Sequence, residues 1–104
     1  MKRIFINAET GEVKEIIPKN KKGLKLQEMY DLISCDLVKH VTLAEGVDLW
    51  IDEEGKLKDG AIQNKIATKY LHKAFPPETW IADGRPVDTV VGNAIIEDAT
   101  DKWL

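Results

Sequence analysis

The sequence predicts a single α+β domain over residues 1–104, with a small mixed, mainly antiparallel sheet and two amphipathic helices. Several segments alternate apolar and polar residues, which is the period of a strand. Two other segments repeat apolar residues at helical spacing. The resulting order of strand, strand, helix, strand, strand, helix, strand is mixed, as in α+β proteins. A chain of 104 residues also fits one compact domain.

The first two strands are expected to form an N-terminal hairpin. Residues 3–7 alternate in the strand period, and residues 8–11 read as a turn in which Gly11 is free to adopt a positive φ. Residues 12–17 return as the second strand. Pro18 closes that strand because it has no backbone N–H to donate.

The first helix is expected after a basic loop at residues 19–23. Four apolar residues then fall at positions i, i+3, i+4 and i+7, which places them on one helical stripe. They are Leu26, Met29, Tyr30 and Ile33. Ser34 and Asp36 end this helix. A strand over residues 37–44 follows, Gly46 ends it, and residues 47–51 form the next strand.

An acidic turn at residues 52–55 is the clearest local signal in the chain. It lies between the apolar residues 49–51 and a segment at 56–58. A type I turn with Gly55 in the left-handed position of a bulge suits this pattern. The sequence therefore predicts a hairpin at this point.

The second helix is predicted over residues 62–74, where apolar residues again follow the helical period, and it stops before Pro76 and Pro77. A loop follows. The final strand is predicted over residues 87–96, with Gly92 at a bulge or a close approach of the backbone.

Composition and charge limit the classes of protein to which the chain can belong. Hydrophobic residues make up 43% and charged residues 32%, an ordinary soluble composition. The net charge of −3 is too small to indicate strong attraction to DNA or anionic lipid. No apolar run approaches the roughly 20 residues of a membrane helix, and the N-terminus turns polar too soon for a signal peptide. A cytoplasmic location is therefore expected.

Catalytic and cofactor sites find little support in the residue pattern. A Cys35–His40 nucleophilic pair needs a thiol of lowered pKa, and Cys35 lies at a predicted helix end, where the dipole disfavours the thiolate. A buried thiol is the preferred interpretation. The chain has no glycine-rich phosphate loop. We expect no enzyme activity, no cofactor and no metal.

A ligand-binding alternative remains open in the acidic region. Four carboxylates within seven positions could bind a hard cation, although their spacing differs from that of a calcium loop. They are Asp48, Asp52, Glu53 and Glu54. The corresponding alternative is a small enzyme, or a protein that binds a metal or a nucleotide, and it would use Asp52, Glu53, Glu54 or His72.

Three motifs occur in order over residues 37–97. They are the acidic turn Asp52-Glu53-Glu54-Gly55, the helix start Asn64-Lys65-Ile66-Ala67-Thr68, and the strand motif Gly92-Asn93-Ala94. In this combination the chain resembles a family of small domains of unknown function found in bacteriophages, plasmids and conjugative elements. The resemblance implies a mobile-DNA setting and brings no catalytic residues.

A nucleic-acid alternative rests on the basic loop, where positive charges are concentrated beside the first helix. The residues concerned are Lys19, Lys21, Lys22 and Lys25. No aromatic residue interleaves them for base stacking, so a solvated basic face is the preferred interpretation.

The three tryptophans point to protein binding. Trp50 is expected in the core, whereas Trp80 lies in the loop after the prolines and Trp103 is almost terminal. Tryptophan is enriched in binding hot spots because it buries a large area at a low entropy cost. We therefore expect Trp80, Arg85 and Trp103 to contact a protein partner.

The function predicted from the sequence is that of a non-catalytic binding module of a phage or mobile element. Its partner would be a host or element-encoded protein, and modulation of a host defence system would fit the setting. An edge strand of the sheet could also pair with a second copy in a homodimer.

Overall fold

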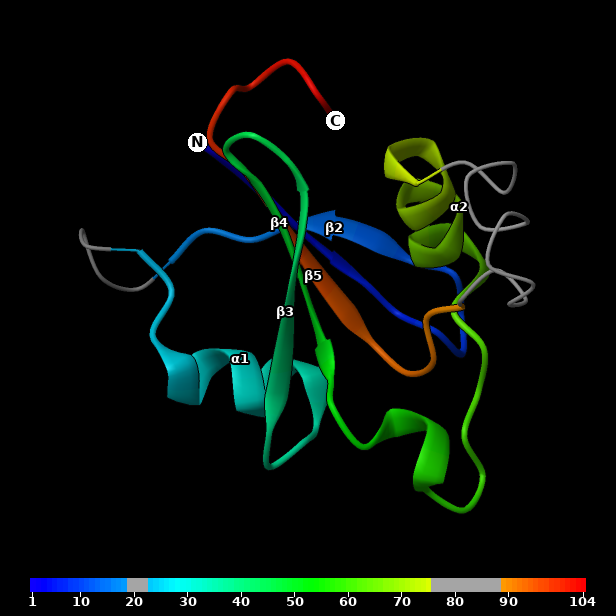
Figure 1. The fold of residues 1–104 in the computed structure, drawn as a ribbon. Helices are drawn as coiled ribbons and strands as arrows, with labels where there is room; N and C mark the ends of the chain where they lie inside the picture. Colours follow the sequence, from blue (N-terminus) through cyan, green and yellow to red (C-terminus); the bar gives the residue numbers. More distant parts are fainter. Residues whose placement is uncertain (19–22, 76–88) are drawn as a thin grey trace.

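The computed structural model describes residues 1–18, 23–75 and 89–104. One five-stranded antiparallel sheet with strand order β2-β1-β5-β4-β3 forms the centre of the fold (Figure 1). The strands are β1 Lys2–Ile6, β2 Val13–Glu15, β3 Val38–Ala44, β4 Val47–Asp52 and β5 Ala94–Asp98. Two α-helices accompany them, α1 Leu26–Ile33 and α2 Lys65–Ala74. The predicted α+β class is confirmed.

The two helices lie on opposite faces of the sheet (Figure 1). On the α2 side, Ile4, Ile96 and Leu49 form a cross-strand row and are buried with Leu71 of α2. On the α1 side, Phe5 and Ile95 are buried with Met29 and Ile33. Because successive side chains of a strand point to opposite faces, the central strands are apolar in consecutive positions.

The N-terminal hairpin is confirmed, with β1 and β2 paired antiparallel. Its second strand is shorter than predicted, because only Val13–Glu15 pairs regularly and all three residues are exposed. Helix α1 is also confirmed, with Met29 and Ile33 of the predicted stripe buried but Leu26 51% exposed. It ends at Ser34, which caps the helix in the left-handed conformation at φ 63°.

The acidic turn does not form the predicted hairpin. Residues Gly55–Leu57 form a short 3₁₀ helix, η1, and β4 pairs instead with β3 and β5. Gly55 has no positive φ. It is required for another reason, because a Cβ atom there would lie 2.9 Å from the Val91 carbonyl oxygen. The glycine allows the backbones of residues 55 and 91 to approach.

Helix α2 begins three residues later than predicted, at Lys65. Ile62 and Gln63 are extended instead: the Ile62 carbonyl accepts a hydrogen bond from Gly92 N–H at 2.8 Å, and Gln63 forms an antiparallel bridge with Val91. Ile62 therefore has helical spacing in the sequence, but the contacts with Val91 and Gly92 hold its segment outside the helix.

The final strand also begins later than predicted, at Ala94. Val90 is fully buried, but its N–H bonds to the Thr68 hydroxyl, 2.9 Å away, and not to a neighbouring strand. Gly92, at φ 84°, then turns the chain into β5. Val87, the predicted start of this strand, lies outside the described residues.

Candidate interaction surface

The outer face of α2 carries a row of exposed lysines at positions 65, 69 and 73. Residues four apart lie above one another on a helix, so the three ammonium groups share one side of α2. None of the ten residues of α2 is acidic. We call Lys65, Lys69 and Lys73 the lysine row.

The lysine row has an electrostatic cost. Like charges at i,i+4 destabilise a helix by about 0.2–0.5 kcal/mol per pair, and Lys65 stands at the positive end of the helix dipole. Within residues 1–18, 23–75 and 89–104, neither Lys65 nor Lys69 forms an ion pair with a carboxylate. No ion pair with a described carboxylate therefore offsets the repulsion, although the acidic residue Glu9 lines one depression together with Lys65 and Lys69.

Two half-buried apolar residues, Ile66 and Tyr70, lie beside the lysines. A shallow depression of about 310 Å³ is lined by both of them together with Lys69 and Lys73. A second depression, of about 490 Å³, lies at the start of α2, where Lys65 and Lys69 face the turn at residues 7–11. The surface therefore combines cations with accessible apolar side chains.

Trp103 extends this surface from the C-terminal tail. Its ring centroid lies 5.8 Å from that of Tyr70, and the Lys73 ammonium lies 4.2 Å from the Trp103 ring centroid, within the range of a cation–π contact. Lys73 also donates a hydrogen bond to the Trp103 carbonyl at 2.7 Å. The tail is therefore packed against the end of α2.

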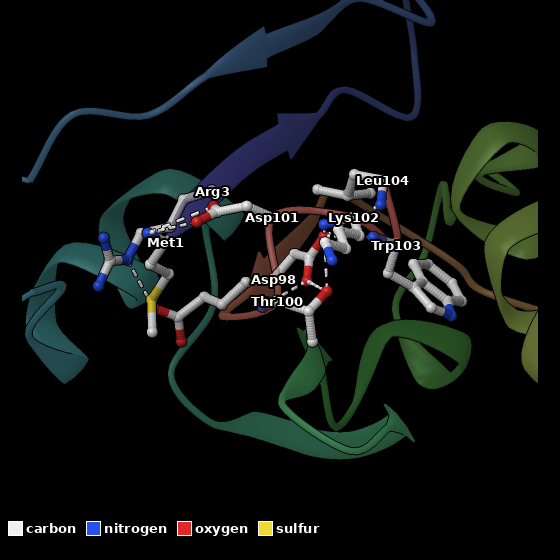
Figure 2. A network of polar contacts seen from close by, with 9 residues as sticks. Met1, Arg3, Asp98, Thr100, Asp101, Lys102, Trp103 and Leu104 are labelled. Carbon is white, nitrogen blue, oxygen red and sulfur yellow. Dashed lines mark hydrogen bonds and ion pairs between the residues drawn. The ribbon is translucent and has the colours of Figure 1, made fainter.

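Asp98, at the end of β5, holds the tail in this position (Figure 2). One carboxylate oxygen accepts hydrogen bonds from the backbone N–H and the hydroxyl of Thr100, at 2.9 and 2.5 Å. The other accepts from the N–H groups of Trp103 and Leu104, at 2.9 and 3.0 Å. The Asp98 side chain is fully buried and connects the sheet to the tail.

The ionised form of Asp98 is stabilised by these bonds. Burial alone would raise its pKa, but the hydrogen bonds from Thr100, Leu104 and Trp103 outweigh burial and lower the pKa to about 2. Since the carboxyl has its ordinary pKa of about 3.9 in the unfolded chain, the folded state binds fewer protons between these values. The resulting stabilisation is complete above about pH 5 and is lost as the pH falls through about 2.

We expect the free energy of unfolding to fall as the pH is lowered from 5 to 2, and we expect Asp98→Asn to remove much of this dependence. Urea titrations at several pH values, monitored by tryptophan fluorescence, measure both proteins. The same slope in the variant and the parent protein would contradict the role of Asp98.

The structure describes only some of the residues predicted to bind a protein partner, and only some of the lysines predicted as an alternative nucleic-acid site. Trp103 is half-buried and lies on the surface just described, whereas Trp80 and Arg85 lie outside the described residues. Of the basic loop, Lys25 is exposed and precedes α1 as its N-cap, and the other three lysines, at 19, 21 and 22, are outside the described residues. Sequence reasoning missed the lysine row, although its four-residue spacing is visible in the sequence.

A polar network lies on the α1 side of the sheet, and Trp50 is its centre. The Trp50 indole N–H donates to Glu97 at 2.9 Å, and Arg3 Nε donates to the other oxygen of Glu97 at 2.7 Å. The His40 ring stacks on Trp50 at 4.7 Å and lies 2.7 Å from Asp48. The half-buried Trp50 ring packs against the cluster under α1, as the core interpretation expects.

The His40–Asp48 pair is a feature that sequence reasoning missed. An imidazole held by a carboxylate can serve as a general base when a nucleophile contacts its second nitrogen. The observed partners of the His40 ring are the Asp48 carboxylate, 2.7 Å from Nε2, and the Trp50 ring. The observed contacts of the pair connect β3 to β4 and hold the ring against Trp50.

Cys35 is half-buried and lies beside a charged pair. Burial, with the nearby carboxylate of Asp52, raises the pKa of the Cys35 thiol. Lys58 lies 2.5 Å from Asp52 and donates to the Ser34 carbonyl at 3.4 Å. Lys58 therefore connects the segment after η1 to the ends of β4 and α1. A thiol of raised pKa is less readily converted to the nucleophilic thiolate.

The three sequence motifs meet at one end of the sheet, where they hold loops together. Asn64 is buried and donates to the carbonyls of Ile6 and Gly92, at 3.1 and 3.0 Å. The Asn93 side chain accepts the N–H of Ala8 at 2.9 Å. Gly55 packs against the backbone of residue 91. These structural contacts account for the glycine and asparagines in the three motifs.

The acidic residues do not converge on one point. Asp48 faces His40 and Asp52 is paired with Lys58, whereas Glu53 and Glu54 are exposed. In the portion of the chain that the structure describes, no three His, Cys, Asp or Glu side chains lie together in a metal-binding arrangement. The described helices also include none with the length and apolar character required to cross a membrane.

Comparisons with known proteins place the chain among domains without an assigned activity. A family model described as "Domain of unknown function (DUF3846)" matches residues 1–103. No curated protein and no solved structure matches the chain.

Proposed function

Because this chain belongs to the DUF3846 family of domains of unknown function, we propose its function from its own geometry: it is a non-catalytic module that binds a protein partner. The lysine row, with Ile66, Tyr70 and Trp103 beside it, carries this proposal. The surface places two lysines that form no ion pair with a described carboxylate beside Tyr70 and Trp103, and these two aromatic residue types are enriched in binding hot spots.

The position of Trp103 supports the proposal. A buried carboxylate with four hydrogen bonds fixes the tail, so the tryptophan is already ordered on the surface of the free domain. Preorganisation lowers the entropy that binding costs. The proposal keeps Trp80 and Arg85, which lie outside the described residues, as further contacts.

The proposal includes the absence of catalytic activity. The potential nucleophile Cys35 has a raised pKa, and His40 is stacked on Trp50 with its carboxylate partner on the same sheet face. Both arrangements differ from an activated nucleophile next to a base.

The setting in phages, plasmids and conjugative elements rests on the sequence resemblance. Integrase, capsid or restriction genes beside the genes of family members would support it. Consistent placement within chromosomal housekeeping operons would contradict it.

Truncation of Trp103 tests the proposed function. We expect tagged protein to retain a specific partner from host lysate, and we expect Trp103→Ala to reduce the recovered amount at least about tenfold, the loss of roughly 1.4 kcal/mol. Leu57→Ala is the matched control, because this apolar side chain is 84% exposed and lies on η1.

Equal recovery with the parent protein, Trp103→Ala and Leu57→Ala would contradict the use of this surface. The circular dichroism spectrum and the unfolding midpoint of Trp103→Ala are measured first. These measurements separate a lost contact from a lost fold.

A further inference from the structure

We propose that the partner reaches the lysine row with an acidic amphipathic helix. This inference rests on the proposed function, since it names the chemistry of the segment that the surface binds. The lysine row supplies the charge argument, and the neighbouring Ile66 and Tyr70 supply the apolar argument.

The charge argument starts from the repulsion along α2. Lys65 and Lys69 have no acidic partner among the described residues, and the 65–69 and 69–73 spacings each bring two cations together. An acidic segment would relieve both repulsions and neutralise the charge at the helix start. In the free domain, repulsion between the lysines destabilises α2. A bound row of carboxylates would remove this repulsion.

The spacing argument concerns the geometry of the partner. Four residues of an α-helix rise about 6 Å, so the lysine row repeats at that interval along α2. A second helix laid alongside α2 presents carboxylates at the same interval when Asp or Glu recurs every fourth residue. Apolar residues next to those carboxylates would then meet Ile66 and Tyr70 in the depression between the lysines.

Observations on the aromatic residues favour a protein partner over a nucleic acid. Single-strand binders expose aromatic faces on which bases stack. Here the Lys73 ammonium covers one face of the Trp103 ring, at 4.2 Å, and Tyr70 is half-buried beside the same ring.

The test uses a designed probe. A fluorescent 18-residue helical peptide carries Glu at every fourth position and Leu directly after each Glu, and a scrambled peptide has the same composition. Fluorescence anisotropy measures binding to the full chain. We expect the designed peptide to bind at least about tenfold more tightly than the scrambled peptide, with weaker binding as salt is raised.

Charge reversal identifies the surface. We expect the double variant Lys65→Glu and Lys69→Glu to lower the affinity for the designed peptide at least about tenfold, because attraction becomes repulsion. The matched control reverses Lys14 and Lys25, which are exposed on β2 and at the start of α1. It changes the net charge by the same amount and should retain binding.

Any of the following outcomes would overturn the inference. They are equal affinity for the designed and scrambled peptides, equal effects of the two double variants, and tighter binding of a 20-nucleotide oligothymidylate than of the peptide. Self-association of the parent protein that is lost in the Lys65→Glu and Lys69→Glu variant would also assign the lysine row to a second copy.

The lysate experiment distinguishes a failure of the acidic-helix inference from a failure of the proposed function. If the reversed protein still captures a lysate partner in a Trp103-dependent manner, the acidic-helix inference is wrong and the binding module stands.

Discussion

Replacement of Asp98 by alanine is expected to lower the free energy of unfolding by about 3–4 kcal/mol. The substitution removes the acceptor for four hydrogen bonds and leaves the N–H groups of Thr100, Trp103 and Leu104 without their observed partner. A small domain is stable by about 5–15 kcal/mol, so this is a large fraction of the total. Urea denaturation monitored by circular dichroism measures the loss.

Asp59→Ala is the matched control for this prediction, since the Asp59 side chain is exposed and the residue has no positive φ. We expect a change of at most about 0.5 kcal/mol there. The tail should also be released in Asp98→Ala, which limited proteolysis followed by mass spectrometry detects as new cleavage after residue 98. A stable, protease-resistant Asp98→Ala protein would show that other contacts hold the tail.

Replacement of Asn64 by alanine is expected to lower the free energy of unfolding by about 3 kcal/mol. The Asn64 side chain caps α2 by accepting the Ala67 N–H at 3.0 Å, and it donates to the carbonyls of Ile6 and Gly92. A single amide therefore connects β1, α2 and the segment before β5. Truncation leaves buried backbone groups unpaired in all three.

Asn64→Ser separates these roles, because serine is also a good N-cap but cannot donate to both carbonyls. We expect a loss smaller than that of Asn64→Ala. Gln63→Ala, at an exposed neighbouring position, should change stability by at most about 0.5 kcal/mol. Equal stability of Asn64→Ala and Asn64→Ser would mean that the cap has no measurable effect.

The local periodicity was sufficient to predict most of the fold. A strand or helix that buries one face repeats apolar residues at the period of that element, and this repeat is visible within a short segment. The alternation around Ile4 and the stripe through Met29 and Ile33 are of this kind. The acidic turn failed as a hairpin signal because β4 is paired on both sides already, with β3 and β5. This long-range pairing cannot be predicted from residues 52–58 themselves.

The start of α2 shows why boundaries were harder to predict. Ile62 fits the helical period, but the bridge between Gln63 and Val91 holds its segment extended. Asn64 is a recognisable N-cap residue, so the correct start was readable from capping chemistry. The helix start predicted from periodicity alone is therefore three residues too early.

The candidate surface was only partly predictable. Trp103 was singled out by residue type, and the structure explains its position through Asp98, which is five residues away in sequence. The acidic residues near the C-terminus gave no indication that one of them is buried as a hydrogen-bond acceptor. The lysine row was readable from its spacing, but its lack of acidic partners among described residues required the fold.

Chemical-shift mapping is the most direct test of the central claim, that the domain binds through α2 and its C-terminal tail. Protein labelled with ¹⁵N is titrated with the partner recovered by the parent protein. The account predicts shifts in the amides of α2 and in the Trp103 indole, with the Trp50 indole, hydrogen-bonded to Glu97, unchanged. Shifts confined to Trp50 and the α1 side of the sheet would contradict it.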